Sequence, residues 1–193
     1  MNNYIQIYKN VISDKYCDEL ITKFEDDTNK ETYDQGPMSF TQVNLNKSQW
    51  QDDISNLSSV FTKYLKQYKN DCVITNHMWP EKYAFEEIRL KKYLANNKDR
   101  FDPHVDSISI ESAKRFLVFF IYLDNNKRGE TNFPQLGLAS PCVKGSLLMF
   151  PPLWPWLHQG MMPIEKPKYM VGSYLHYTLD TKYQIMYNRC INE

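Results

Sequence analysis

The sequence predicts a mainly β protein of the α+β class, in which N-terminal helices buttress a double-sheet β core. Apolar residues recur at helical spacing up to about residue 70, and strand-like patterns begin at about residue 83. The length of 193 residues suits one domain that buries a sizeable core. We therefore expect a single domain over residues 1–193, with helical support at about 11–70 and the β core at about 83–190.

The first half of the chain predicts a short strand followed by two helices. Residues 4–10 alternate in polarity as an edge strand does. Ser13 is a suitable N-cap for the first helix, and a polar segment at about 26–39 is expected to form a loop after it. The second helix is expected to pack against a sheet. The apolar faces of the two helices consist of Cys17, Leu20, Ile21 and Phe24, and of Trp50, Ile54, Leu57, Phe61, Tyr64, Leu65 and Tyr68.

The second half predicts a series of strands. Residues 85–93 alternate apolar with charged side chains, as a half-exposed strand does. Residues 115–123 are nearly all apolar, so this strand is not expected to face solvent. Further strands are expected at 146–150, 169–177 and 184–187, and turn-rich loops at 125–129, 140–141, 151–152 and 162–163.

Composition excludes several classes of protein. The formal charge is zero and no dense block of lysine and arginine occurs, which argues against sequence-independent nucleic-acid binding. The four cysteines are far apart, as reduced thiols of a cytosolic protein usually are. The N-terminus lacks the basic start and apolar run of a signal peptide, and no segment approaches transmembrane length. We therefore expect a soluble cytoplasmic protein with no membrane partner, and nothing in the sequence indicates its oligomeric state.

Two segments of the second half carry residues suited to a metal. His104 and Asp106 form an H-x-D triplet, and His158 follows 52 residues after Asp106, which leaves room for three intervening strands. Two histidines and one carboxylate are the ligands of an open-sided iron(II) site. Considered alone, each part has a simpler interpretation. His104 and Asp106 are then a surface turn, and His158 is a buried histidine among tryptophans. Lys168, ten residues after His158, is then a solvated lysine at the end of a strand. His77 and His176 lack a carboxylate at ligand spacing and are interpreted as structural.

In combination, the segment from about 83 to 177 resembles the prolyl 4-hydroxylase-like family of 2-oxoglutarate- and iron(II)-dependent dioxygenases. Residues 11–21 are also similar to the first helix of that family, so the resemblance covers nearly the whole chain. The matching pieces, in family order, are Tyr93, residues 101–106, residues 115–124, residues 129–134, residues 144–150, residues 157–160 and Lys168.

The resemblance implies a double-stranded β-helix (jelly roll) core and a set of site residues. His104, Asp106 and His158 would bind iron(II), while Lys168 and Tyr93 would hold the distal carboxylate of 2-oxoglutarate. Arg115 is the alternative cation for that carboxylate, and the residues assigned to a substrate pocket are Tyr122, Arg115, Trp156 and Tyr174. The implied cofactors are Fe(II), 2-oxoglutarate and O2, with ascorbate as a supporting reductant. Related halogenases carry a small residue in place of the ligand carboxylate, so Asp106 favours hydroxylation of a substrate C–H bond, with release of succinate and CO2.

The sequence departs from the family near the expected substrate entrance. Arg128 stands where the family often has glycine, Tyr174 where it often has tryptophan, and the loop after Tyr93 contains no glycine. Segments 28–44 and 94–101 are expected to frame the entrance. The leading substrate is a peptidyl side chain such as proline. The alternatives are a free amino acid or another small molecule and, in a different class, a non-catalytic β-barrel binding module.

Overall fold

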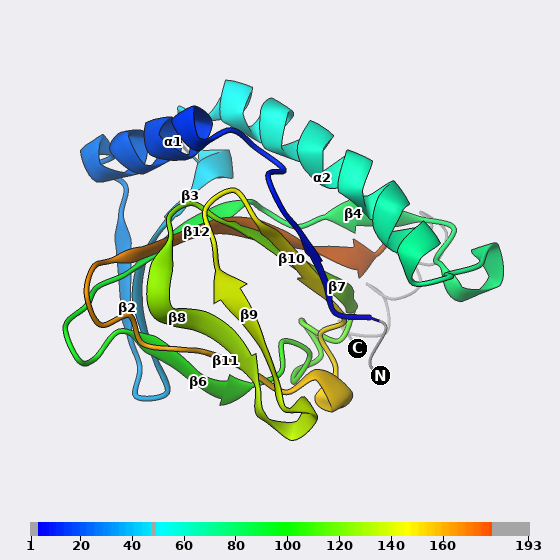
Figure 1. Cartoon of the computed structure of the whole chain (residues 1–193). Coiled ribbons are helices and arrows are strands. Elements are labelled where there is room, and N and C mark those ends of the chain that lie inside the picture. The colour runs from blue at the N-terminus through cyan, green and yellow to red at the C-terminus, as the bar shows by residue number, and fades with distance from the viewer. Residues whose placement is uncertain (1–3, 48, 179–193) are drawn as a thin grey trace, which may run out of the picture.

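One continuous antiparallel sheet curves into a nearly closed barrel, and two α-helices lie outside it in the computed structural model, which describes residues 4–47 and 49–178 (Figure 1). The helices are α1 (Asp14–Asp26) and α2 (Gln51–Asp71). The strands are β1 (Gln6–Tyr8), β2 (Glu31–Asp34), β3 (Met38–Asn44), β4 (Tyr83–Phe85), β5 (Arg89–Tyr93), β6 (Arg100–His104), β7 (Arg115–Tyr122), β8 (Asn126–Phe133), β9 (Leu138–Cys142), β10 (Leu147–Phe150), β11 (His158–Gly160) and β12 (Lys168–Tyr177). Short 3-10 turns occupy Leu45–Lys47, Asn76–Met78, Pro134–Leu136 and Trp154–Trp156.

The barrel has two walls that meet at β3. The larger wall runs in the order β1-β10-β7-β12-β5-β3, and the smaller wall continues as β6-β11-β8-β9. The junction is short: Met38 and Ser39 of β3 pair with Phe101 and Arg100 of β6. The predicted double-sheet, jelly-roll core is confirmed, and β1 is the edge strand that its alternation predicted, because it pairs only with β10 among the described strands.

Both helices cover the outer face of the larger wall (Figure 1). The predicted cap is present, since the Ser13 hydroxyl accepts a 3.2 Å hydrogen bond from the backbone N–H of Tyr16. The apolar face of α2 packs on the sheet as expected, with the Phe61 ring 4.7 Å from that of Phe119 on β7. Within the described part of the chain, no helix combines the length and hydropathy that crossing a membrane requires.

After Arg115, strand β7 is apolar, because residues 117–122 are buried on both faces of the strand. Successive side chains of a strand point to opposite faces. Phe119 and its alternate neighbours therefore join the core beneath the helices, while Phe120 and its alternate neighbours join a second core inside the barrel. The expectation that residues 115–123 avoid solvent is confirmed for 117–123, whereas Arg115 and Phe116 are partly exposed.

The expected loop at 26–39 is wrong over its second half. Residues 31–34 and 38–44 form a β-hairpin, β2–β3, whose turn contains Gly36 in the left-handed region (φ 60°). The entrance segment at 28–44 is thus mostly strand. Its polarity concealed it, because β3 turns Phe40 and Gln42 inward and both are buried, although glutamine in a sequence reads as an exposed residue.

Three smaller boundaries also differ from expectation. Residues 85–93 do not form one strand, because the chain breaks at 86–88 and β4 and β5 pair with different parts of β12. The expected loop at 125–129 lies almost wholly in β8, and Ser140 and Pro141 lie within β9. The strand expected at 184–187, and the last part of the β core expected to reach 190, lie outside the described residues.

Candidate active site

Antiparallel pairing of β6 with β11 brings the two predicted histidines together. His104 is the last residue of β6, His158 is the first of β11, and they are directly opposite in the register. Four strands, β7 to β10, lie between them in sequence rather than the three for which room was expected. Asp106 lies just beyond the end of β6, and its backbone N–H donates a 3.1 Å hydrogen bond to the carbonyl oxygen of Pro152.

Both imidazoles are oriented by hydrogen bonds on their far side. Nδ1 of His104 lies 2.8 Å from the Asp102 carbonyl oxygen, and Nδ1 of His158 lies 3.1 Å from that of Trp156. Since a carbonyl only accepts, Nδ1 carries the proton and the lone pair of Nε2 points toward Asp106. Burial lowers the pKa of His104 to about 4 and also lowers that of His158, so both rings are neutral, the form that binds metals.

Asp106 completes a set of three ligand atoms without protein partners of their own. Its Oδ2 is fully buried, accepts no hydrogen bond within the described residues, and lies 3.4 Å from Nε2 of His158. Its Oδ1 lies 3.8 Å from Nε2 of His104. One ligand atom from each of the three residues falls within a 4.8 Å cluster. An orphaned buried carboxylate oxygen costs about 1–3 kcal/mol, and a divalent cation among these donors would remove that cost. The donor set therefore fits iron(II).

Tyr174 holds the ligand carboxylate from behind, and Arg115 packs against Tyr174. The Tyr174 hydroxyl donates a 2.8 Å hydrogen bond to Oδ1 of Asp106, which leaves Oδ2 as the oxygen free to bind a metal. Burial, and next the charge of Asp106, raise the pKa of Tyr174 well above its ordinary value, so the hydroxyl keeps its proton. The Arg115 guanidinium stacks 4.0 Å from the centre of the Tyr174 ring and donates two 2.8 Å hydrogen bonds to Glu86.

Lys168 is a buried cation whose counter-ion is missing from the described protein. Its side chain is 1% exposed, and Nζ donates only a 3.3 Å hydrogen bond to the Met161 carbonyl oxygen. Nζ also lies 4.4 Å from the ring centre of Tyr93, its direct partner across the β12–β5 ladder. No described carboxylate forms an ion pair with it, and burial lowers its pKa to about 8. An unpaired ammonium in a dry environment marks a position for an anion.

The ligand atoms and Lys168 line one small cavity inside the barrel. Its volume is about 50 Å³, and Tyr93, Phe101 and Gly160 also line it. The Phe101 ring stacks on His104 with 3.5 Å between ring centres. A β-carbon on Gly160 would lie 3.8 Å from Nζ of Lys168, so glycine keeps the space before this ammonium open.

Two residues assigned to the pocket by sequence lie outside the lining of this cavity. The Tyr122 hydroxyl is buried and donates to the hydroxyl of Thr131 at 2.8 Å. Trp156 contacts the edge of Tyr4 and supplies the carbonyl that orients His158. Arg115 and Tyr174 do line the wider groove that adjoins the cavity.

Comparison with solved structures finds the same fold in 2-oxoglutarate oxygenases. The viral collagen prolyl hydroxylase of Paramecium Bursaria Chlorella virus-1, in complex with 2-oxoglutarate, matches with a TM-score of 0.68 at 19% identity over 92% of this chain and 98% of that one. The prolyl hydroxylase of Trichoplax adhaerens, in complex with a hypoxia-inducible factor peptide, matches at 0.67 and 12% identity, with 91% and 84% covered. The non-heme α-ketoglutarate-dependent epimerase SnoN of nogalamycin biosynthesis matches at 0.65 and 10% identity, with 91% and 78% covered.

These likenesses define the fold. The chain has the prolyl 4-hydroxylase-like fold of the 2-oxoglutarate/Fe(II) oxygenases, as its motifs predicted. No family model matches the sequence, and no curated protein matches it significantly. Since the same fold carries out hydroxylation in some proteins and epimerisation in another, the reaction must be argued from the residues of this chain.

Sequence reasoning missed Lys91, and it named Tyr174 as a pocket residue without its contact to Asp106. Lys91 lines the cavity but was interpreted as part of a half-exposed strand. Lys91 lies two residues before Tyr93, and residues two apart in a strand share a face. This spacing was the feature of the sequence that could have placed Lys91 in the site. The hydrogen bond from Tyr174 to Asp106 spans 68 residues, and the sequence holds no signal for it.

Tyr174→Phe should weaken metal binding without disrupting the fold. The change leaves Oδ1 of Asp106 without its donor, which typically costs about 1–3 kcal/mol of stability, and loss of such an orienting contact lowers metal affinity roughly 10- to 100-fold. Anaerobic calorimetric titration with Fe(II) measures the affinity. Tyr169→Phe is the matched control, since it removes a hydroxyl bonded to a carboxylate (Glu25, 2.7 Å) from the other face of β12. Equal affinities for wild type and Tyr174→Phe would refute the positioning role.

Lys168→Met should stabilise the protein when neither iron nor 2-oxoglutarate is present. A lysine pKa lowered from its ordinary value to about 8 disfavours the folded state at neutral pH by roughly 3 kcal/mol. The folded pKa is the lower one, so the penalty is complete below pH 8 and fades toward about pH 10.4, the ordinary lysine pKa. The difference in unfolding free energy between variant and wild type should therefore favour the variant at pH 7 and shrink between pH 8 and 10.

Urea denaturation across that pH range measures the difference. Lys166→Met serves as control, because Lys166 is half exposed and pairs with Asp124 at 2.6 Å. A Lys168→Met variant that is no more stable than the control at pH 7 would show that the ammonium carries no burial penalty.

Proposed function

We propose that this protein is an Fe(II)- and 2-oxoglutarate-dependent dioxygenase that hydroxylates a substrate C–H bond and releases succinate and CO2. The observation that carries the proposal is the buried, unpartnered Oδ2 of Asp106 beside the Nε2 atoms of His104 and His158. Three such ligands on one side of a metal leave positions free for a co-substrate and oxygen. A non-catalytic binding module would have no need for this set, nor for a buried cation in the same cavity.

The metal ligands, Lys168, Tyr93 and the apolar rings of the cavity each have a part in this reaction. When bound, iron and 2-oxoglutarate supply the activation of O2, in which one oxygen atom enters the substrate C–H bond and the other enters succinate as CO2 leaves. Lys168 pairs with the distal carboxylate of 2-oxoglutarate, and the Tyr93 hydroxyl donates to it. Arg115 cannot take the place of Lys168, because its guanidinium is engaged by Glu86. The apolar rings around the metal ligands exclude water from the reacting centre.

The leading substrate is a peptidyl side chain such as proline. Large apolar side chains are exposed on both loops that carry metal ligands, with Ile108 and Ile110 after Asp106 and Trp154 before His158. Exposed apolar groups beside a site suit contact with a polypeptide. The alternative is a free amino acid or another small molecule, which the groove next to the cavity could hold. We place the protein in the cytosol, since Cys17 and Cys142 are buried free thiols.

Anaerobic addition of Fe(II) and 2-oxoglutarate tests the proposal directly. A visible metal-to-ligand charge-transfer band should form, and succinate should appear on admission of air. Asp106→Ala should abolish both while leaving the fold intact, since it removes a metal ligand whose buried Oδ2 has no hydrogen-bond partner among the described residues. Asp18→Ala is the control, because that carboxylate lies on α1 and pairs with Lys144 at 2.6 Å. Full activity in Asp106→Ala would remove this residue from the site.

Lys168→Ala should mainly impair the use of 2-oxoglutarate. The distal carboxylate would lose its cation inside a buried site, which typically costs about 2–5 kcal/mol, or more than 20-fold in apparent affinity. Succinate formation as a function of 2-oxoglutarate concentration measures the effect, and Lys166→Ala should leave it unchanged. An unaltered 2-oxoglutarate dependence in Lys168→Ala would show that another basic residue is the partner.

A further inference from the structure

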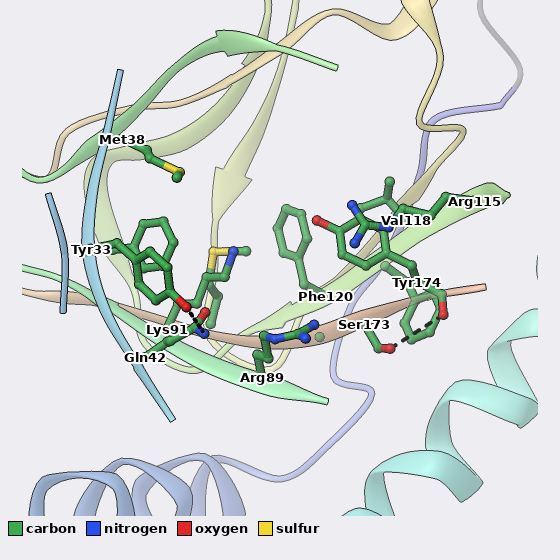
Figure 2. A pocket seen from close by; sticks show the side chains of 14 residues that line it. Tyr33, Met38, Gln42, Arg89, Lys91, Arg115, Val118, Phe120, Ser173 and Tyr174 are labelled. Carbon is green, nitrogen blue, oxygen red and sulfur yellow. Dashed lines mark hydrogen bonds between the residues drawn. The ribbon is translucent and has the colours of Figure 1, made fainter. Parts of the chain in front are cut away.

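A groove of about 280 Å³ adjoins the metal cavity, and Figure 2 shows the side chains that line this groove. The two spaces share five lining residues, so a molecule lying in the groove can reach the ligand cluster. The shared residues are Lys91, Val118, Phe120, Met170 and Tyr174. Tyr33 and Met38 from the β2–β3 hairpin line one end of the groove, and Arg115 lies toward the other.

Cations project into this groove because of the alternation of β5. Arg89, Lys91 and Tyr93 share the inner face of the strand, while Leu90 is fully buried under the helices and Lys92 pairs with Glu25 of α1. Figure 2 shows the Arg89 and Lys91 side chains next to each other along the groove. The inner face thus carries two basic residues ahead of the tyrosine that faces Lys168.

Lys91 differs from the other cations of the groove in having no acidic partner. Arg89 pairs with Glu87 at 2.9 Å, and Arg115 pairs with Glu86 at 2.8 Å. No carboxylate of the described residues lies within ion-pair distance of Lys91. Its Nζ rests instead over the Phe40 ring, 4.5 Å from the centre.

The surroundings of Lys91 make this charge costly. Burial lowers the pKa of Lys91 to about 8, and the carboxylate that offsets this most is Asp106. In the loaded enzyme Asp106 would be a ligand of the metal. In the loaded site, the positive charges of iron(II) and Lys168 balance the negative charges of Asp106 and of the two carboxylates of 2-oxoglutarate. No negative charge is therefore left to neutralise Lys91.

We propose that Lys91 binds a carboxylate of the primary substrate, and that the groove selects substrates bearing that group close to the carbon that is hydroxylated. This inference rests on the proposed function and specifies its substrate class. A carboxylate held at the boundary between groove and cavity directs the adjoining carbons toward the metal ligands. The aromatic and apolar walls, including Phe120 and Tyr33, reduce the contact of Lys91 with water and strengthen the pairing.

The carboxylate has two plausible sources, and matched pairs of compounds separate them. One series consists of free L-amino acids, each compared with its primary amide. The other consists of acetylated and amidated proline-containing peptides that differ only by glutamate or glutamine next to the proline. The rate of succinate formation from 2-oxoglutarate is measured at several concentrations of each compound. Its dependence on concentration gives kcat/KM for that compound.

At least one acid should stimulate wild-type enzyme roughly 30-fold or more above its amide, the low end of the effect of losing one partner of a buried charge pair. Lys91→Met should abolish this preference, and Lys91→Arg should retain most of it. Lys92→Met is the matched control, because it removes the same charge from the opposite face of β5, and it should behave as wild type. Shifts in the thermal unfolding midpoint with acid or amide give a second readout that needs no turnover.

Three results would overturn the inference. In the first, wild type forms succinate but no carboxylate in either series outperforms its amide. In the second, Lys91→Met keeps the acid preference. In the third, Lys91→Met impairs use of 2-oxoglutarate as strongly as Lys168→Ala does, which would assign Lys91 to the co-substrate. The first two leave the proposed function standing, whereas a wild type that binds neither iron nor 2-oxoglutarate removes both.

Discussion

The structure depends on one constraint, the alternation of side chains along β5, β7 and β12. These strands lie between the helices and the barrel interior, and successive side chains point to opposite faces. The buried side chains of these strands have one of two destinations, the apolar core under the helices or the interior of the barrel. A slip of one residue would exchange the two sets, placing Val171 in the cavity and Lys168 in the core. The register that packs the core is therefore the register that positions the site.

Glycine at one position of β12 makes that register possible. A β-carbon on Gly172 would lie 2.3 Å from the carbonyl oxygen of Phe119 and 2.4 Å from the β-carbon of Phe120. No substituent fits at that separation, so β12 and β7 approach each other more closely there than side chains would allow. This contact lies on the groove wall, and it holds Tyr174, two residues on, against Asp106.

The parts of the fold that could be predicted from sequence are those where polarity and burial agree. The helices followed this rule, and β7 did so because its residues from Leu117 to Tyr122 are all apolar and buried. Strand β3 did not, because Gln42 and Ser39 are buried polar groups that bond to the hairpin and to Asp99. In the site, motif order was enough to place His104, Asp106, His158 and Lys168. It could not reveal Lys91, because a lysine in a strand is nearly always solvated.

The site has charged groups whose partners the described protein does not supply. Asp106 has a buried oxygen without a donor, and two lysines in the same interior have lowered pKa values. Such groups reduce the stability of the folded chain by itself, a familiar cost of function. A ligand of opposite charge is therefore bound by its own contacts, and its binding also removes the free-energy cost of the unpaired charge.

The position of β3 also has a consequence for motion. Thr41–Asn44 of this strand are hydrogen-bonded to β5 of the larger wall, and Met38 and Ser39 pair with β6 of the smaller wall. The groove margin built from this hairpin cannot swing outward as a lid without breaking backbone bonds to both walls. Access should therefore depend on nanosecond rotation of side chains such as Tyr33 and Met38 rather than on slower backbone closure. An enzyme with such a rigid margin discriminates by fit to a preformed shape, so its tolerance for larger molecules is set by the width of the barrel mouth.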